Sequence, residues 1–338
     1  MSITRINAYA VKHRGGQAEP FSYDRTLGTH DVLVRITHCS LARGDVQFID
    51  DDWGDTTFPL VPGHEIVGIV EETGSAAAGL AIGDRVGIGY QQEACFSCEF
   101  CNDGSEQLCP SQKVIGVDCY GGLADRIGVD ARFAFKLPPT LDSAASAPLL
   151  SAGLTVYAAI VRAGLRNGSA VAVMGIGGLG QLAIQFLRHM GHTVSAFSHS
   201  PAKRPLIERL GATYVDGSNR DGVADARRKF DLILSTLNTA FDLNGYLDML
   251  RPQGKLCFVA QPLEDLSIRV GRLYDNAQRT IYGNYVGSRK DMTDMLAFAA
   301  EHDVESIVEI MPFSKVNQAI DLVRAGTLPM RVVLQAER

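Results

Sequence analysis

The sequence predicts an α/β protein in two parts, a largely β domain joined to a doubly wound domain with a parallel sheet. Residues 1–148 alternate short runs of β-forming residues with turns that contain glycine and proline. Residues 149–284 alternate apolar, strand-like runs with segments of helical periodicity, which is the βαβ rhythm of a parallel sheet. The length of 338 residues also favours two domains over one.

The β-like part is predicted from strand signals at DVLVRITH (31–38), HEIVGIVEETG (64–74), DRVGIGY (84–90) and GGLADRIGV (121–129). In the second part SAVAVMG (169–175) is an unbroken apolar run, as a buried parallel strand should be. A helix is predicted over 178–191, a strand over 193–199, a helix over 202–212 and strands over 230–237 and 255–261. The tail predicts helices over 291–302 and 314–326 and a final strand over 331–335, and we expect it to return to the first domain.

The bulk composition is that of an ordinary globular protein, with 46% hydrophobic and 21% charged residues. A net charge of −6 argues against a nucleic-acid or anionic-membrane partner. The start, MSITRINAYAVKHRGG, lacks the apolar run of a signal peptide, so a cytoplasmic location is expected. The nearly charge-free stretch 144–161 is interrupted by Pro148 and Gly153 and predicts buried core rather than a membrane span.

Four of the seven cysteines fall within fifteen residues, at Cys95, Cys98, Cys101 and Cys109. In a chain without an export signal this spacing indicates metal binding rather than disulfides. Four thiolates on a short loop form a closed tetrahedral site, so the prediction is one structural zinc per chain that takes no part in catalysis. The other three, Cys39, Cys119 and Cys257, lack ligand-like spacing and are predicted to be buried structural cysteines.

A glycine-rich turn, GIGGLG, follows the predicted strand at 169–175 and opens the next helix. In that context Gly175 permits the tight turn, Gly177 lets the backbone approach a pyrophosphate, and Gly180 lets the helix pack on the strand. Gly178, the fourth glycine of the motif, is also predicted to belong to the cofactor site. The amino terminus of the helix attracts phosphate groups. A dinucleotide site is therefore predicted.

The end of the second strand of that domain indicates which dinucleotide binds. Where NAD-binding folds usually carry Asp or Glu, this chain has Ser198, Ser200, Lys203 and Arg204. Two hydroxyls and two cations suit a 2′-phosphate through charge-assisted hydrogen bonds, which favours NADP(H). The alternative is that Lys203 and Arg204 are only the solvated start of a helix.

Five segments carry a family resemblance over essentially the whole chain: FPLVPGHEIVG (58–68), the cysteine loop, APLLSAGLTVY (147–157), the GIGGLG turn and YGNYVGSRKDMTDML (282–296). They resemble the zinc-containing medium-chain dehydrogenase/reductase superfamily, best its cinnamyl alcohol dehydrogenase-like branch. The resemblance implies a GroES-like catalytic domain over 1–148 plus 285–338 and a Rossmann NADP(H)-binding domain over 149–284. It also implies hydride transfer between nicotinamide and a zinc-bound carbonyl, a proton relay that begins at a Ser or Thr, and a homodimer.

The catalytic zinc site departs from that family pattern. The positions of the three ligands, usually Cys, His and Cys, hold Ala42, His64 and Ser151, and Gly44 stands where the relay hydroxyl is expected. Loss of two thiolates should lower zinc affinity steeply. We therefore expect the catalytic zinc to be absent, with a weak site of His64, Glu65 and water left open.

Other features of the family site are retained. Asp45, which in the family orients the ligand histidine, is present, as are Glu65 and the pyrophosphate-contacting Arg43. His64 with Asp45 behind it is the first candidate for a hydrogen-bond donor or general acid, Ser151 is a second donor, and Glu65 is a possible acid or base. The bland alternatives are a retained core histidine and a small space-filling serine.

Without zinc the substrate must be more electrophilic, because zinc normally stabilises the developing alkoxide. The leading hypothesis is an NADPH-dependent reductase of an activated double bond, conjugated C=C or C=N before plain C=O. The alternatives are an alcohol/aldehyde dehydrogenase with an atypical metal site and a non-catalytic NADPH-binding protein. Trp53 and Tyr120 either shape a pocket for an aromatic or conjugated small molecule or only pack against neighbouring side chains.

The remaining histidines, among them His199, are predicted to lie on the surface or to support other residues.

Overall fold

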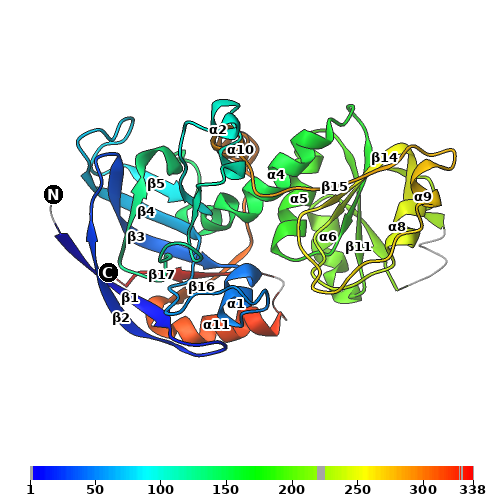
Figure 1. Ribbon diagram of the computed structural model, residues 1–338. Coiled ribbons are helices and arrows are strands. Elements are labelled where there is room, and N and C mark those ends of the chain that lie inside the picture. Colours follow the sequence, from blue (N-terminus) through cyan, green and yellow to red (C-terminus); the bar gives the residue numbers. More distant parts are fainter. Residues whose placement is uncertain (1–2, 219–224, 327, 329, 338) are drawn as a thin grey trace. The chain divides into compact units, whose positions relative to one another are not determined.

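The computed structural model describes residues 3–218, 225–326, 328 and 330–337 (Figure 1). The chain forms two compact units, one of Met1–Leu154 with Ser288–Arg338 and one of Thr155–Gly287. The predicted boundaries at 148/149 and 284/285 fall a few residues before those of the structure. Within these units the predicted fold class is confirmed: one is largely β and the other is an α/β unit with a parallel sheet.

The first unit is built on a seven-stranded sheet of order β16-β17-β3-β4-β5-β9, with β8 also paired to β3. Its long central strand, β3, pairs antiparallel with β4, β8 and the chain's last strand, β17. The tail therefore returns to the first unit, as expected. The strands of this unit are β1 (Ile3–Val11), β2 (Ala18–Thr26), β3 (Asp31–Leu41), β4 (Glu65–Thr73), β5 (Arg85–Ile88), β6 (Gln91–Glu93), β7 (Lys113–Val114), β8 (Arg126–Asp130), β9 (Ala134–Lys136), β16 (Val308–Pro312) and β17 (Arg331–Gln335).

Short helices surround this sheet. Helix α1 starts directly after the end of β3, and α10 begins with a capping box in which Ser288 and Asp291 satisfy each other's backbone donors. Helix α11 ends at Gly326, which has a left-handed backbone (φ 63°). The helices of this unit are α1 (Arg43–Ile49), α2 (Glu99–Asn102), α3 (Ser143–Ser146), α10 (Arg289–His302) and α11 (Val316–Ala325), with 3-10 turns η1 (Glu106–Leu108), η2 (Ala131–Phe133), η3 (Ala147–Leu150) and η5 (Phe313–Lys315). Helix α4 (Ala152–Ala163) begins in this unit and continues into the second.

The charge-free stretch 144–161 covers most of α3, η3 and α4, and nearly all of its residues are buried, which confirms it as core. Among the described residues no single helix is long and apolar enough to cross a membrane. One bent pair, Ser143–Leu150 with Ala152–Ala163 at 52°, meets the length and composition test.

The second unit is a parallel six-stranded sheet of order β12-β11-β10-β13-β14-β15. The order reverses direction at β10, so the carboxyl ends of β10 and β13 flank the switch point where ligands of doubly wound sheets bind. The strands are β10 (Ala170–Met174), β11 (Thr193–Ser198), β12 (Thr213–Asp216), β13 (Phe230–Ser235), β14 (Leu250–Phe258) and β15 (Thr280–Gly283). The helices are α5 (Gly178–His189), α6 (Arg204–Arg209), α8 (Leu243–Met249) and α9 (Gly271–Tyr274), with the 3-10 turn η4 (Pro201–Lys203).

Several predicted elements have shifted bounds. The helix predicted over 202–212 is a 3-10 turn followed by the short α6, because Pro205 at the start of α6 lacks an amide hydrogen and fits only a first turn. Strand β14 begins five residues before the predicted run at 255–261. The prediction that Cys119 is buried is wrong, because this residue is only half-buried. Cys39 and Cys257 are buried as expected.

Candidate functional site

A buried histidine–carboxylate pair forms the centre of the candidate site in the first unit. His64 precedes β4, and Asp45 lies in the first turn of α1. The Nδ1 of His64 is 2.9 Å from the Oδ1 of Asp45. Backbone amides of Ala42 and Gly63 donate to the same carboxylate at 2.7 and 2.8 Å. These hydrogen bonds hold the Asp45 carboxylate in place, and it in turn fixes the orientation of the His64 ring. Nε2 is then the ring nitrogen left to contact a substrate.

The charges of this pair support each other. Burial opposes protonation of His64, but the adjacent carboxylate and its hydrogen bond outweigh burial and raise the pKa of His64 above its ordinary value. Burial likewise opposes ionisation of Asp45, but His64 and the two backbone amides outweigh it and lower the pKa of Asp45. The pair therefore favours imidazolium beside carboxylate.

Glu65, proposed from sequence as an acid or base, has both carboxylate oxygens engaged. Its Oε1 accepts from the backbone amide of Ala152 at 3.1 Å, and its Oε2 forms an ion pair with Arg331. Glu65 is fully buried and the Arg331 side chain is 12% exposed. These contacts favour an orienting role, because the carboxylate joins β4, β17 and the start of α4. Sequence analysis missed Arg331; its one signal was a charge at the start of an otherwise apolar final strand.

The two positions that lack thiolates are also in this unit. Ala42 caps α1 and is held to Asp45, and Ser151 lies between η3 and α4, one residue before the amide that binds Glu65. Both are nearly buried. Within the described part of the chain the Ser151 hydroxyl has no hydrogen-bond partner and so is free to donate.

The donor set does not fit a catalytic zinc. A methyl group and a hydroxyl stand at the two thiolate positions, and both oxygens of Glu65 are taken. Among the described residues, no group of three or more His, Cys, Asp or Glu side chains other than the four-cysteine cluster is arranged to hold a metal. His64 alone among the three ligand positions keeps a metal-binding side chain.

The aromatic residues proposed for a substrate pocket make packing contacts. Trp53 packs edge-on against Phe48, with ring centroids 4.8 Å apart. Tyr120 packs against Tyr23 at 4.6 Å and Phe21 at 5.4 Å. The ring that contacts His64 is Tyr90, at 5.5 Å and nearly perpendicular. Tyr90 is therefore an aromatic neighbour of the candidate site, and the sequence analysis did not identify it.

The four predicted metal cysteines come together on the loop that contains α2 and η1. The sulfur atoms of Cys95, Cys98, Cys101 and Cys109 all lie within 4.8 Å of one another. A tetrahedral zinc with bonds of about 2.3 Å needs sulfurs about 3.8 Å apart, so the cluster fits that ion closely. Hydrogen bonds from Ser97 and from the backbone amide of Cys98 lower the pKa of Cys95 to about 5, whereas burial and the neighbouring thiols raise the pKa of Cys101. A metal ion would favour the thiolate form of all four.

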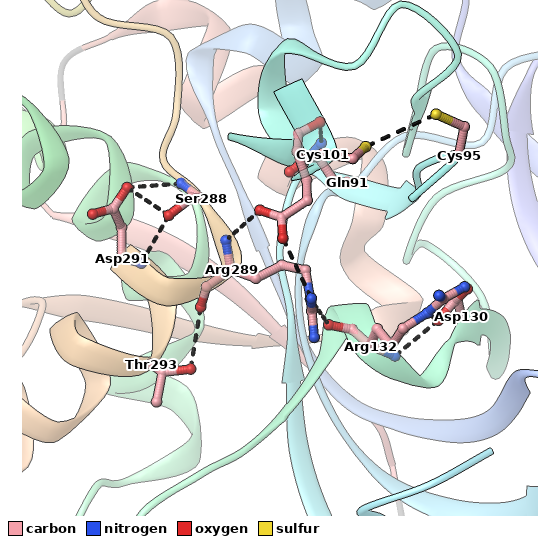
Figure 2. Close-up of polar contacts among 10 residues, drawn as sticks. Gln91, Cys95, Cys101, Asp130, Arg132, Ser288, Arg289, Asp291 and Thr293 are labelled. Carbon is pink, nitrogen blue, oxygen red and sulfur yellow. Dashed lines mark hydrogen bonds and ion pairs between the residues drawn. The ribbon is translucent and has the colours of Figure 1, made fainter. Parts of the chain in front are cut away.

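Arginine contacts tie the cysteine loop to the start of α10 (Figure 2). The Arg289 guanidinium pairs with Glu106 at 3.3 Å and donates to the carbonyl of Arg132 at 2.8 Å. Arg132 in turn pairs with Asp130 at 2.6 Å and stacks over the ring of Phe96, with its guanidinium carbon 3.4 Å from the ring centroid. The loop is thus fixed by charged contacts outside the cluster itself.

In the second unit the glycine-rich turn joins β10 to α5. Gly175 has a left-handed backbone (φ 87°). A side-chain Cβ built at position 180 would lie 2.0 Å from the carbonyl oxygen of Gly175, so only glycine fits there. A Cβ at Gly177 would meet nothing within 4 Å in the described structure, and Gly178 opens α5. Open space before a helix amino terminus suits a pyrophosphate.

The structure gathers three of the four residues proposed for the 2′-phosphate at the end of β11. The Ser198 hydroxyl accepts from the amide of Ser200 at 3.1 Å. The ammonium of Lys203 donates to the carbonyl of Ile176, inside the glycine-rich turn, at 2.9 Å. Arg204 instead pairs with Glu208 at 2.8 Å on the exposed face of α6. Lys203 therefore links the turn to the end of β11, and Arg204 is engaged along its own helix.

Arg43, proposed as a pyrophosphate contact, is the first residue of α1 in the first unit. It is exposed, and its guanidinium donates to the carbonyl of Arg324 at 2.8 Å.

Comparison with known proteins gives concordant similarities. Residues 28–139 match the model of the alcohol dehydrogenase GroES-like domain, and residues 178–301 match that of the zinc-binding dehydrogenase domain. The chain is 38% identical over 331 residues to an aldehyde reductase of Synechocystis, covering 97% of this chain and 98% of that protein. Two solved structures are also similar. A cinnamyl alcohol dehydrogenase of Sorghum bicolor has a TM-score of 0.94, with 31% sequence identity and 98% coverage of both chains. One of Helicobacter pylori, complexed with NADP(H), has a TM-score of 0.92, with 26% identity and 99% coverage of both chains.

Proposed function

This chain belongs to the zinc-type alcohol dehydrogenase family of medium-chain dehydrogenases/reductases, and on that premise we propose that it is an NADPH-dependent reductase that works without a catalytic zinc. Its substrate is a small molecule with an activated double bond, a conjugated C=C or C=N ahead of a plain C=O. The single observation that carries the proposal is the replacement of two thiolate ligands by Ala42 and Ser151 around an intact His64–Asp45 pair.

The cofactor assignment rests on the second unit. The turn at Gly175–Gly180 supports a pyrophosphate, and Ser198, Ser200 and Lys203 offer two hydroxyls and a cation where a carboxylate would hold NAD. The similar Helicobacter pylori enzyme was solved with NADP(H). When bound, NADPH supplies the hydride.

The residues of this chain supply the electrostatic part of the reaction. Hydride addition to the β-carbon of a conjugated carbonyl leaves negative charge on the oxygen as an enolate. The imidazolium of His64, held by Asp45 at Nδ1, offers Nε2–H to that oxygen, and the Ser151 hydroxyl is free to offer a second hydrogen bond. A proton from His64 then completes the reduction.

The preference for an activated bond follows from the strength of these donors. A zinc ion stabilises a developing alkoxide by several kcal/mol through direct coordination. An imidazolium and a hydroxyl stabilise an oxyanion only through hydrogen bonds. They can therefore stabilise less negative charge on the substrate oxygen in the transition state than a zinc ion can. An enolate spreads its charge over several atoms, and an iminium group is already positive before hydride arrives. Either substrate therefore needs less stabilisation than a simple ketone or aldehyde.

Four cysteines of the chain also form a candidate site for a structural metal ion. Cys95, Cys98, Cys101 and Cys109 would hold one zinc, which would order their loop without touching substrate. No step of the proposed reaction passes through it.

Zinc content measured together with activity tests this proposal. Elemental analysis of purified protein should give one zinc per chain, and NADPH oxidation should be faster with enals, enones or cyclic imines than with the matching saturated aldehydes. The matched variant is Ala42→Cys/Ser151→Cys, which restores the two thiolates and should bring a second zinc. A wild-type value of two zincs per chain, with chelator-sensitive alcohol oxidation, would overturn the proposal.

A second candidate is reduction of a plain aldehyde by the same residues. The specific observation in its favour is the 38% identity to a protein named aldehyde reductase. In this case saturated aldehydes would be reduced as fast as the conjugated ones, still with one zinc per chain. The same substrate panel therefore separates the two candidates.

A further inference from the structure

The imidazole of His199 lies at the carboxyl edge of the second unit's sheet, on the backbone of Gly217. Strands β11 and β12 run parallel there, with Ser198 paired to Asp216, so the next residues along the two strands are His199 and Gly217. The amide of Gly217 donates to the carbonyl of Ser198 at 3.1 Å. A Cβ built at Gly217 would lie 2.7 Å from Cδ2 and 3.0 Å from Nε2 of the imidazole. The ring of His199 occupies its place only because residue 217 is glycine.

The turn that carries His199 is held from both sides. The Ser198 hydroxyl accepts from the amide of Ser200 at 3.1 Å, and the Tyr214 hydroxyl donates to the carbonyl of Ser198 at 3.4 Å. His199 is at the tip of this turn and is exposed. Its ring is therefore positioned by the backbone beneath it yet remains open to a ligand.

The other charged side chains around the turn are already engaged. Lys203 donates to a backbone carbonyl, Arg204 pairs with Glu208 and lies over the ring of Tyr214 at 5.9 Å, and Asp216 accepts from the amide and hydroxyl of Ser218 at 2.9 and 2.6 Å. In the part of the chain that the structure describes, His199 forms no ion pair. A ligand can therefore bind the ring nitrogen of His199 without breaking an ion pair. The ammonium of Lys203 can also donate further hydrogen bonds beside the one to Ile176.

We infer that His199 is a cofactor-specificity residue, whose imidazole donates a hydrogen bond to the 2′-phosphate of NADP(H) alongside Ser198, Ser200 and Lys203. The inference rests on the proposed use of NADP(H) and adds a residue to the recognition of its phosphate. An imidazole has an N–H to donate in either protonation state, and the bond to a phosphate is stronger when the ring is charged. The sequence alone placed His199 only on the surface or in support of other residues.

Binding of the cofactor and of its adenosine fragments tests the inference without any turnover. The ligands are NADPH, NADH, 2′,5′-ADP and 5′-AMP, titrated by calorimetry or nicotinamide fluorescence against the wild type and His199→Ala. The expected result is about tenfold weaker binding of NADPH and 2′,5′-ADP, with NADH and 5′-AMP changed less than about twofold. His199→Arg should keep the preference for the phosphate. His189→Ala, at the far end of α5, is the control and should change none of the four.

A double-mutant cycle with Gly217 distinguishes loss of the hydrogen bond between His199 and the phosphate from a general disturbance of the binding site. Gly217→Ala should displace the ring and weaken NADPH about as much as His199→Ala does. In the double variant the alanine at 217 should add little, because the ring it displaces is gone. Equal weakening of the phosphorylated and unphosphorylated ligands, full additivity of the two changes, or no loss on His199→Ala would overturn the inference. A wild type that binds NADH as tightly as NADPH would instead refute the proposed cofactor.

Discussion

At the scale of single residues, Asp45 is the neighbour that contributes most to raising the pKa of His64. The carboxylate of Asp45 raises the pKa of His64 against the opposing effect of burial. If the imidazolium donates to the substrate oxygen, the rate of reduction is full below that pKa and falls as the pH rises through it. The alkaline limb of the pH–rate profile therefore reports the pKa of His64 as it is set beside Asp45.

Replacing Asp45 by Asn removes the charge that raises the pKa of His64. The alkaline limb should therefore move to lower pH, and kcat/KM at pH 8 should fall by about tenfold, because less imidazolium is present. The measurement is kcat/KM with the best conjugated substrate from pH 5 to 10. Asp321→Asn, at an exposed carboxylate on α11, is the control and should leave the profile in place. An unchanged limb in Asp45→Asn would show that another group supplies the proton.

At the scale of secondary structure, Gly44 lies inside a helix, at the position where the family resemblance implies a relay hydroxyl. Gly44 is the second residue of α1, and a Cβ there would lie 3.8 Å from Cε1 of His64, which is ordinary contact. Gly44→Ala should stabilise the protein by about 0.5 kcal/mol, because alanine loses less backbone entropy in a helix. Thermal unfolding should show a midpoint raised by about 1–2 °C. Gly180→Ala should do the opposite, since its Cβ would collide with the backbone of Gly175.

The first residue of α10 holds the cysteine loop in place. Arg289 bonds to Glu106, whose side chain is only 8% exposed, and to the carbonyl of Arg132 (Figure 2). Arg289→Ala should destabilise the protein by about 2 kcal/mol, because a nearly buried carboxylate is left without its partner. Urea denaturation measures the loss. Lys290→Ala is the matched control: its ion pair with Asp294 is exposed, so the change should be below about 0.5 kcal/mol. Equal effects of the two variants would contradict this role of Arg289.

The elements found from the sequence are those with a strong local pattern. The apolar run of β10 and the helical periodicity of α5 predicted both, and the spacing of the four cysteines predicted their cluster. Strand β2 was missed because AEPFSYDRT is mostly polar and half-exposed, and β14 was placed too late because it begins LRPQGK. Such strands are defined by backbone pairing to neighbours, which leaves little trace in hydrophobicity.

At the scale of the whole molecule, the candidate site depends on parts of the chain that are far apart in sequence. Asp45 and His64 come from the first strand-rich region, whereas Arg331, which holds Glu65, begins the last strand. The antiparallel pairing of β17 with β3 brings these segments together. No local pattern encodes that pairing, so the ion pair of Glu65 with Arg331 could be found only from the structure. The family pattern, by contrast, predicts the positions of His64, Ala42 and Ser151 from the sequence alone.

The metal cluster and the candidate reaction site belong to the same unit but share no residue, which gives a testable separation. Removal of zinc should loosen the loop around Cys95–Cys109, because the four sulfurs would no longer be joined through a common ion. The loss should spread to the first turn of α10 through Glu106 and Arg289. The β10–α5 turn belongs to the other unit and should keep its protection. Amide hydrogen exchange before and after chelation measures each segment at once. Loss of protection confined to the loop and α10 would assign the metal a local structural role, and equal loss across the glycine-rich turn would show that it stabilises both units.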